Sequence, residues 1–176
     1  SVSVTSPESA GAGHQWVVGG SSTLSIADVE AAQTLTFTWT EQYYLTVSSA
    51  RGSPSGEGWY NAGASATFGV TSPDVAGTTR YVLSAWASVD TGGYSGTAVS
   101  QSVTMNNAIT ETASWTHQVQ NTFSVSGVSG SDSAVLTGTY LGTGSSTIVT
   151  LNSGNSWSAS AWSDYNTAVT FPSSTA

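Results

Sequence analysis

The acidic residues of the chain include one close pair that could exchange protons. Asp28 and Glu30 stand two positions apart and would share one face of an extended strand, as catalytic carboxylates can. Charges on an edge strand also discourage pairing with another chain, and we favour this role for the pair. No calcium-binding Asp-x-Asp-x-Asp-Gly loop occurs, and the other aspartates stand in turn-like sequences, where Asp is common: Asp74, Asp90, Asp132 and Asp164. We therefore predict no metal site.

The histidines do not indicate catalysis. His14 and His117 are far apart in the sequence, and neither has the serine or carboxylate context that marks a catalytic triad. The Gly/Ser-rich stretch 142–146 lacks the lysine and the following helix of a phosphate-binding loop. We therefore predict a protein that is not an enzyme, with no catalytic residue and no cofactor.

Aromatic residues offer a different chemistry, the stacking of rings on sugars. Trp59 and Tyr60 are adjacent, and Trp157 and Trp162 follow near the end of the chain. Carbohydrate-binding modules use exposed aromatic rings in this way, but aromatic residues in alternating strands more often fill a core or an interface. We favour the packing role and keep Trp59 and Tyr60 as candidate glycan-stacking residues.

Composition excludes several classes of partner. Only 7% of the residues are charged, with two Arg, no Lys and a net charge of −8, so the chain should not bind nucleic acid or anionic membranes. With neither Cys nor Lys, disulfides and Lys–Asn isopeptide bonds are impossible. No apolar run approaches the roughly 20 residues of a membrane helix, and no Asn-x-Ser/Thr glycosylation sequence occurs. We expect no membrane insertion and no covalent cross-links.

The same composition predicts where the protein works. Ser and Thr are abundant, so hydroxyl groups rather than ion pairs must wet the surface, and such a surface changes little with pH. We expect an extracellular, cell-surface protein from which any signal peptide has been removed.

The hydrophobic pattern places these residues in an all-β fold. Apolar residues alternate with polar ones in short runs separated by Gly, Ser, Asn and Pro, as in sandwiches and barrels. We predict one or two Ig-like or jelly-roll-like β-sandwich modules with an extended N-terminal strand, and at most one helical turn, over residues 27–33. The predicted strands cover residues 1–5, 35–39, 43–47, 66–70, 81–86, 102–105, 110–115, 122–126, 134–140, 147–151, 157–162 and 167–171.

A short sequence motif that occurs twice suggests how the chain is divided into modules. The step Trp-Thr-x-Gln occurs at Trp39–Gln42 and again at Trp115–Gln118, a spacing that suits one small β module. We predict an N-terminal strand and hinge over residues 1–13 and a central module over residues 42–117. Residues 14–41 and 118–176 supply further sandwich strands, which either pack together or form two partial units.

The central region resembles a known family. Residues 43–117 look like the divergent InlB B-repeat, an extracellular repeat of bacterial and archaeal surface proteins. The resemblance implies a small β fold used as a spacer or display module, with no catalytic residues. It is carried by Tyr44-Leu-Thr-Val47, Gly58-Trp-Tyr-Asn-Ala-Gly63, Ala66-Thr-Phe-Gly-Val70, Tyr81-Val-Leu-Ser-Ala-Trp86, Val103-Thr-Met105 and Ile109–Trp115.

The N-terminus suggests a mode of assembly. Residues 1–5 alternate, with Val2 and Val4 on one face, and Pro7 and the Gly-rich stretch 10–13 separate them from the rest of the chain. Such a strand could complete the sheet of a neighbouring copy through main-chain hydrogen bonds, or pair within its own domain. The arrangement resembles archaeal thread-type and bundling pili, although those are typically N-glycosylated and this chain has no acceptor sequence.

The leading hypothesis is therefore a non-covalent, head-to-tail homopolymer, a filament built by donor-strand complementation. Its donor strand would consist of Ser1, Val2, Ser3, Val4 and Thr5. The alternative is an adhesin or carbohydrate-binding module of a larger surface protein, with surface glycans as partners. That alternative predicts exposed Trp side chains and a monomer. An enzyme is the weakest of the three hypotheses.

Overall fold

The fold is all-β, as the sequence predicts. The structure is a computed structural model that describes residues 1–28, 30–127, 133–138 and 146–168. Strands account for 55% of the chain and no α-helix occurs among the described residues, so the all-β prediction is confirmed. The one helical element described is a 3-10 turn, η1 (Ser153–Asn155), which begins after Asn152. The Asn152 side chain accepts hydrogen bonds from the backbone N–H groups of Gly154 and Asn155.

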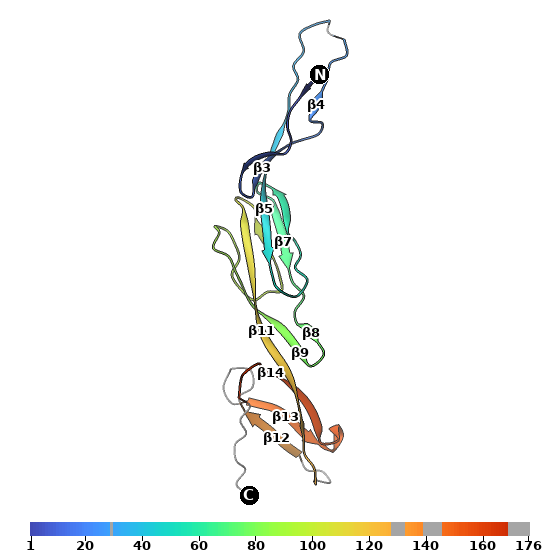
Figure 1. The fold of residues 1–176 in the computed structure, drawn as a ribbon, viewed down its shortest axis with the longest axis vertical. Coiled ribbons are helices and arrows are strands. Elements are labelled where there is room, and N and C mark those ends of the chain that lie inside the picture. Colours follow the sequence, from blue (N-terminus) through green and yellow to red (C-terminus); the bar gives the residue numbers. More distant parts are fainter. Residues whose placement is uncertain (29, 128–132, 139–145, 169–176) are drawn as a thin grey trace. The chain divides into compact units, whose positions relative to one another are not determined.

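The strands follow one another through the whole described chain (Figure 1). In chain order they are β1 (Val2–Ser3), β2 (Glu8–Gly11), β3 (His14–Val18), β4 (Thr23–Leu24), β5 (Trp39–Ser48), β6 (Gly58–Asn61), β7 (Ser65–Gly69), β8 (Asp74–Ala76), β9 (Thr79–Ala87), β10 (Ser100–Thr104), β11 (Ile109–Ser124), β12 (Ser133–Gly138), β13 (Ser146–Asn152) and β14 (Ser158–Asp164).

Most strands join one mixed sheet. Its order is β2-β3-β5-β11-β9-β8, with β6 added to β5 and β14 added to β11. Three separate two-stranded ribbons, β1-β4, β7-β10 and β12-β13, complete the topology of the described residues. All pairs with a described register are antiparallel except β5 and β11, which run parallel through Leu45–Ser48 and Ile109–Thr112.

The chain forms two compact units. Unit 1 consists of Ser1–Thr71 and Leu83–Ser114, and unit 2 of Ser72–Val82 and Trp115–Ala176, so that β9 and β11 each contribute residues to both. These boundaries differ from the three segments that the sequence predicts. Whether those segments are separate domains stays a prediction.

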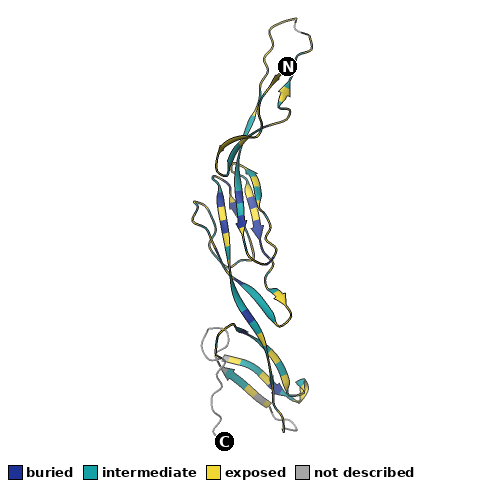
Figure 2. Cartoon of the chain, viewed as in Figure 1, coloured by how far each residue is buried: buried dark blue, intermediate teal, exposed yellow. Residues whose placement is uncertain are grey.

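Unit 1 has a well-filled apolar core. Alternate residues of β5 and β7 point inward, and they meet residues of β9, β10 and β11, which appear dark blue in Figure 2. At its centre the ring of Phe68 meets that of Trp86 edge to face, with centroids 4.9 Å apart. The buried apolar residues of this core are Leu45, Val47, Ala66, Phe68, Val70, Leu83, Trp86, Val103, Met105 and Ile109.

Fewer apolar residues are buried among the described residues of unit 2. Its strand β14 pairs with β11 from Gln118 to Ser124, and β12 pairs with β13. Among the described residues of this unit, Leu151 is the only apolar residue that is buried. Ring stacking supplies part of the packing, because His117 lies between Tyr81 and Tyr165 at centroid distances of 4.5 and 4.6 Å.

Two strand predictions differ from the structure in a common way. Of residues 35–39 only Trp39 lies in a strand, and the first strand shrinks from residues 1–5 to Val2–Ser3. Alternation alone does not make a strand, because its backbone groups need a neighbouring strand to pair with. The described residues of the stretch 27–33 form no helical turn, and most of the predicted strand 167–171 lies outside the described residues.

The prediction from the sequence also missed a β-hairpin. The Gly-rich stretch 10–13, predicted as a hinge, joins β2 to β3, which pair with each other. Strand β3 then pairs with β5 from Val18↔Trp39 to His14↔Tyr43. The glycines thus form a turn whose strands continue the main sheet.

Candidate functional site

The predicted donor strand belongs to a thinly packed part of unit 1. We call this part the N-terminal arm and define it as residues 1–7 and 19–38, which flank the β2–β3 hairpin. Val2 pairs with Leu24 and Ser3 with Thr23, and the backbone N–H of Val4 donates to the carbonyl of Ser22 at 2.9 Å. Figure 1 shows β4 beside the N-terminus. The chain thus pairs its first strand with itself, although over two residue pairs only.

The arm buries none of its described apolar side chains completely. None of its described residues is buried, and Val2 is 53% exposed. A two-stranded ribbon is marginally stable in water unless other strands or a packed face support it. The apolar residues concerned are Val2, Val4, Leu24, Ile26, Leu35 and Phe37, all partly or fully exposed.

The tip of the β2–β3 hairpin is held against the rest of unit 1 by a close approach of backbones. Gly13 has no side chain, and its carbonyl accepts a hydrogen bond from the backbone N–H of Tyr44 at 2.9 Å. Its φ is +68°, and a Cβ atom there would lie 2.6 Å from the Cβ of Ala108. Only glycine fits this position, where the hairpin tip lies against β5 and the residue that precedes β11.

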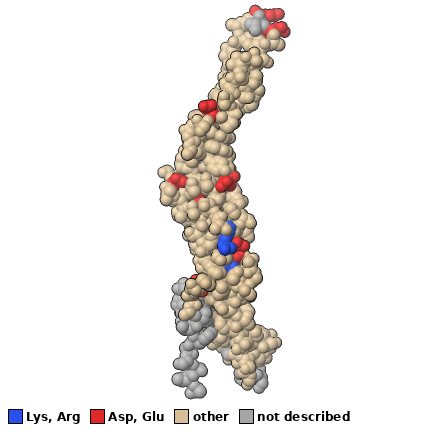
Figure 3. Space-filling view, in the orientation of Figure 1, with Lys and Arg blue, Asp and Glu red and all other residues tan. Residues whose placement is uncertain are grey.

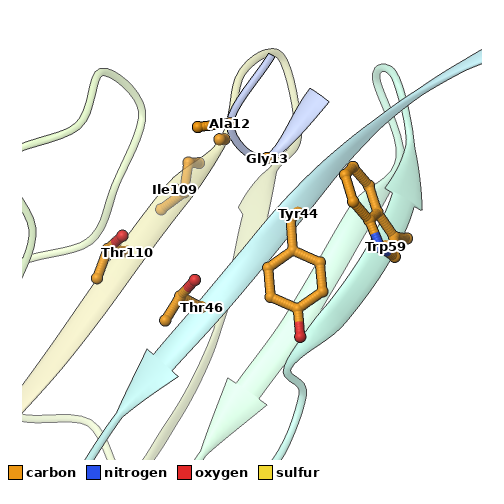
Figure 4. Close-up of a pocket in the computed structure, with 8 residues that line it drawn as sticks. Ala12, Gly13, Tyr44, Thr46, Trp59, Ile109 and Thr110 are labelled. Carbon is orange, nitrogen blue, oxygen red and sulfur yellow. The ribbon is translucent and has the colours of Figure 1, made fainter. Parts of the chain in front are cut away.

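An open pocket of about 420 Å³ lies beside this hairpin tip (Figure 4). Tyr44 and Thr46 of β5 and Thr110 of β11 line it on the face of the sheet opposite Leu45 and Val47. The remaining lining residues are Ala12, Gly13, Trp59, Ala108 and Ile109. Trp59 is 40% exposed, and its ring meets that of Tyr44 edge to face at 5.1 Å and 70°.

Trp59 and Tyr60, predicted together, lie on different surfaces. Adjacent strand residues point to opposite faces, and the register pairs Trp59 with Tyr44 and Tyr60 with Tyr43. Tyr60 is half-buried and donates its hydroxyl to the carbonyl of Gly56 at 2.8 Å. The aromatic partner of Trp59 is therefore Tyr44, which the sequence reasoning missed because it shows only once the register between β5 and β6 is known.

Polar side chains continue the face that carries the pocket. Gln15, Gln42 and Asn61 form an amide row, with hydrogen bonds of 2.9 Å from Gln15 to Gln42 and from Gln42 to Asn61. The Tyr44 hydroxyl donates to Glu57 at 3.2 Å. Burial raises the pKa of Tyr44, and the hydrogen bond to Glu57 adds to this rise. The face thus combines aromatic rings with neutral hydrogen-bonding groups.

The other face of the same strands carries a second aromatic cluster. The His14 ring stacks on Tyr43 at 4.8 Å, and its Nε2 lies 2.9 Å from Glu41 Oε1. The Tyr43 hydroxyl donates to the same oxygen at 2.9 Å, and this hydrogen bond raises the pKa of Tyr43. Trp16, 38% exposed, lies beside His14 at 6.1 Å. The contacts in this cluster are pairwise, and the buried Nε2 of His14 lies close to Glu41 without forming a hydrogen bond of acceptable geometry. The cluster contains no Ser, Cys or Lys side chain that could act as a nucleophile.

Titratable groups elsewhere do not converge on a common point. The described residues contain no set of three or more His, Cys, Asp or Glu side chains placed to share a metal ion. They also contain no helix of the length and hydropathy that a membrane crossing requires. Figure 3 shows a face with few charged atoms. That the protein is not an enzyme stays a prediction.

One carboxyl group is buried in unit 1. Glu111 is fully buried, and its Oε1 accepts a hydrogen bond from the backbone N–H of Tyr94 at 2.7 Å. Its Oε2 has no hydrogen-bond partner among the described residues. Burial raises the pKa of Glu111, and the nearby Asp90 charge raises it further, against the lowering effect of the Tyr94 hydrogen bond. The hydrogen bond to Glu111 comes from a backbone N–H and not from a nucleophilic side chain, which favours a structural role.

Comparison with protein-family models, with curated proteins and with solved structures gives no match to this chain. The resemblance of residues 43–117 to the divergent InlB B-repeat therefore stays a prediction.

Proposed function

We propose that the protein is a structural subunit of a non-covalent extracellular filament, a head-to-tail homopolymer in which β1 and its flanking residues form the donor strand. The observation that carries the proposal is the N-terminal arm, which fully buries none of its described apolar side chains and whose first strand is held by two residue pairs. An arm of this kind gains stability when another subunit covers it.

The chemistry of residues 1–5 suits strand donation. Val2 and Val4 share one face and can enter an apolar groove, while Ser1, Ser3 and Thr5 share the other face and can meet water. The main-chain groups that now pair with β4 would pair with a longer acceptor strand of the next subunit. The exchange replaces a short ladder with a longer one and buries both valines, so we expect it to be favourable.

We propose unit 2 of the next subunit as the acceptor. The register places Val119 and Phe123 of β11 on the same face as the buried Ser163, yet both apolar side chains are only half-buried. Leu136 and Val149, which pair across β12 and β13, are also half-buried. An added strand bearing Val2 and Val4 would complete the cover of these residues.

The finer architecture belongs to the same proposal. We propose that each unit is a small β-sandwich of Ig-like or jelly-roll-like type, which the buried residues of β5, β7, β10 and β11 support for unit 1. An extracellular, cell-surface location is supported by the low charge and by the abundance of Ser and Thr, whose hydroxyl groups wet the surface. The resemblance to surface repeat modules and to archaeal threads points the same way.

Charge placed on one face of the donor strand tests the proposal. The double variant Val2→Asp/Val4→Asp should abolish filaments in electron micrographs of purified protein, because two carboxylates cannot enter an apolar groove. The matched control Ser1→Asp/Ser3→Asp adds the same charge to the opposite face and should still assemble. Filaments from the valine variant, or a wild-type chain that stays monomeric at high concentration, would contradict the proposal.

The acceptor is tested separately. A chain lacking residues 1–6 should bind a synthetic peptide of residues 1–6, with slower amide hydrogen exchange in β11 to β14 and no change in β5 and β7. A peptide carrying aspartate at positions 2 and 4 should give no protection. Protection confined to unit 1 would reject unit 2 as the acceptor while leaving donor-strand assembly standing.

A further inference from the structure

We propose that the pocket between the hairpin tip, β5, β6 and β11 binds a neutral sugar unit of a surface glycan. The pocket is open, measures about 420 Å³ and combines two aromatic rings with two threonine side chains, Thr46 and Thr110 (Figure 4). Its volume lies at the lower end of ligand sites in proteins, which suits one or two sugar rings. This proposal does not rest on filament assembly.

The aromatic wall suits the apolar face of a sugar ring. Trp59 exposes 40% of its surface in a strand whose other aromatic residue, Tyr60, is half-buried and hydrogen-bonded. Tyr44 meets the Trp59 ring edge to face and is itself tethered by its hydroxyl to Glu57. The Glu57 carboxylate in turn accepts from the backbone N–H of Val47 at 3.3 Å. This chain of contacts holds the exposed ring in place before a ligand arrives, which lowers the entropic cost of binding.

The remaining lining residues of the pocket supply hydrogen-bonding groups and leave space for a ligand. Thr46 and Thr110 are paired across the parallel ladder, so their side chains are neighbours on the face that carries the pocket. Small residues, Ala12, Gly13 and Ala108, leave one side open. Hydroxyl groups can both donate and accept, which matches the hydroxyl groups of a sugar.

Charge selects for a neutral ligand. The chain contains no Lys, and neither of its arginines, Arg51 and Arg80, lines the pocket. Two carboxylates contact residues that line the pocket: Glu57 accepts from the Tyr44 hydroxyl and Asp90 from the backbone N–H of Thr110. Both would repel an acidic sugar or a phosphate. The amide row of Gln15, Gln42 and Asn61 extends the same neutral, polar face, along which further sugar units could lie.

The test compares two exposed tryptophans in the same unit. Trp59 and Trp16 are 40% and 38% exposed, and their strands place them on opposite faces of β5. The full chain is titrated by calorimetry with neutral oligomers of glucose, mannose, galactose and N-acetylglucosamine, and with oligomers of galacturonic acid. We expect one neutral series to bind, Trp59→Ala to weaken it about tenfold, and Trp16→Ala to change it less than about twofold.

A variant that keeps the shape of the pocket guards against a folding artefact. Thr110→Val removes a hydroxyl from the lining but leaves the backbone N–H of Thr110, which donates to Asp90 at 2.7 Å. It should weaken the same neutral oligomer about threefold or more and leave thermal unfolding unchanged. Absence of binding by every neutral series, equal loss in Trp16→Ala and Trp59→Ala, or equal affinity for the acidic oligomers would each overturn the proposal.

Discussion

The described residues of the two units differ in how completely their apolar side chains are buried. Unit 1 buries side chains from five strands around Phe68 and Trp86, whereas Leu151 is the only buried apolar residue among the described part of unit 2. Both units are built from similar alternating sequences, and both use extended antiparallel ladders. Local alternation therefore does not explain the difference, which lies in how the strands pack against one another in each unit.

The difference indicates which unit can stand by itself. Apolar burial is the main favourable term in folding, so unit 1 has the core that it needs. Unit 2 relies more on ladder hydrogen bonds, on the His117 stack and on polar contacts such as that of Arg80, whose Nε donates to Gln118 at 2.7 Å. Such a unit has more to gain from an added strand, which is why we assign it the acceptor role.

Removing the centre of the unit 1 core should have the largest effect. Trp86 is 1% exposed, and Trp86→Ala should destabilise the protein by about 4 kcal/mol through the cavity left beside Phe68. Denaturant unfolding followed by amide exchange would assign the loss to unit 1. Val89→Ala, at a fully exposed side chain of the segment that follows β9, is the control and should be neutral. A comparable loss of protection in β12 and β13 would show that the units do not unfold separately.

A matched pair of leucines sharpens the comparison. Leu45 in unit 1 and Leu151 in unit 2 are both fully buried, so burial alone predicts equal costs. We expect Leu45→Ala to cost about 3 kcal/mol and Leu151→Ala about 2 kcal/mol, because a site with partly exposed neighbours can relax into the space. The free energies of unfolding of the two variants provide the measurement. Equal costs would mean that the core of unit 2 is as tightly packed as that of unit 1.

The same contrast explains what could be predicted from the sequence. Alternation located strands such as β7, with Ala66 and Phe68 inward, because a buried face imposes a strict period of two. It failed for residues 35–38, which alternate equally well but lie in the arm without a partner strand. The local sequence pattern indicates which side chains a strand would bury. Only the tertiary structure shows whether other strands cover those side chains.

The candidate sites follow the same logic. Trp59 was found because an aromatic residue beside a glycine turn is conspicuous in the sequence. Tyr44, Thr46 and Thr110 were not, because the parallel pairing of β5 with β11 joins segments about sixty residues apart, and nothing local specifies that register. The buried Glu111 was missed for the same reason, since its surroundings come from Tyr94 and the other strands of unit 1.

The smallest effect that we predict is a pH dependence of stability, caused by the buried Glu111 in unit 1. Burial raises the folded-state pKa of Glu111, whereas in the unfolded chain a Glu titrates near 4.3. The protonated form is therefore the one that folding favours. Its contribution to stability is fully present below about pH 4.3 and is lost as the pH rises through the folded-state pKa. The wild type should accordingly lose stability between acidic and neutral pH.

Glu111→Gln should remove this loss. The amide keeps an oxygen that can accept from the N–H of Tyr94 and carries no charge, so the variant should be more stable than the wild type by about 1 kcal/mol near pH 7. Near pH 4 the two should be equally stable, because the wild-type carboxyl is then neutral as well. Glu8→Gln, at an exposed residue of β2, is the control and should show no such pH-dependent gain. Denaturant midpoints measured across this range would decide the matter, and a constant difference at every pH would mean that the charge of Glu111 is tolerated in the core.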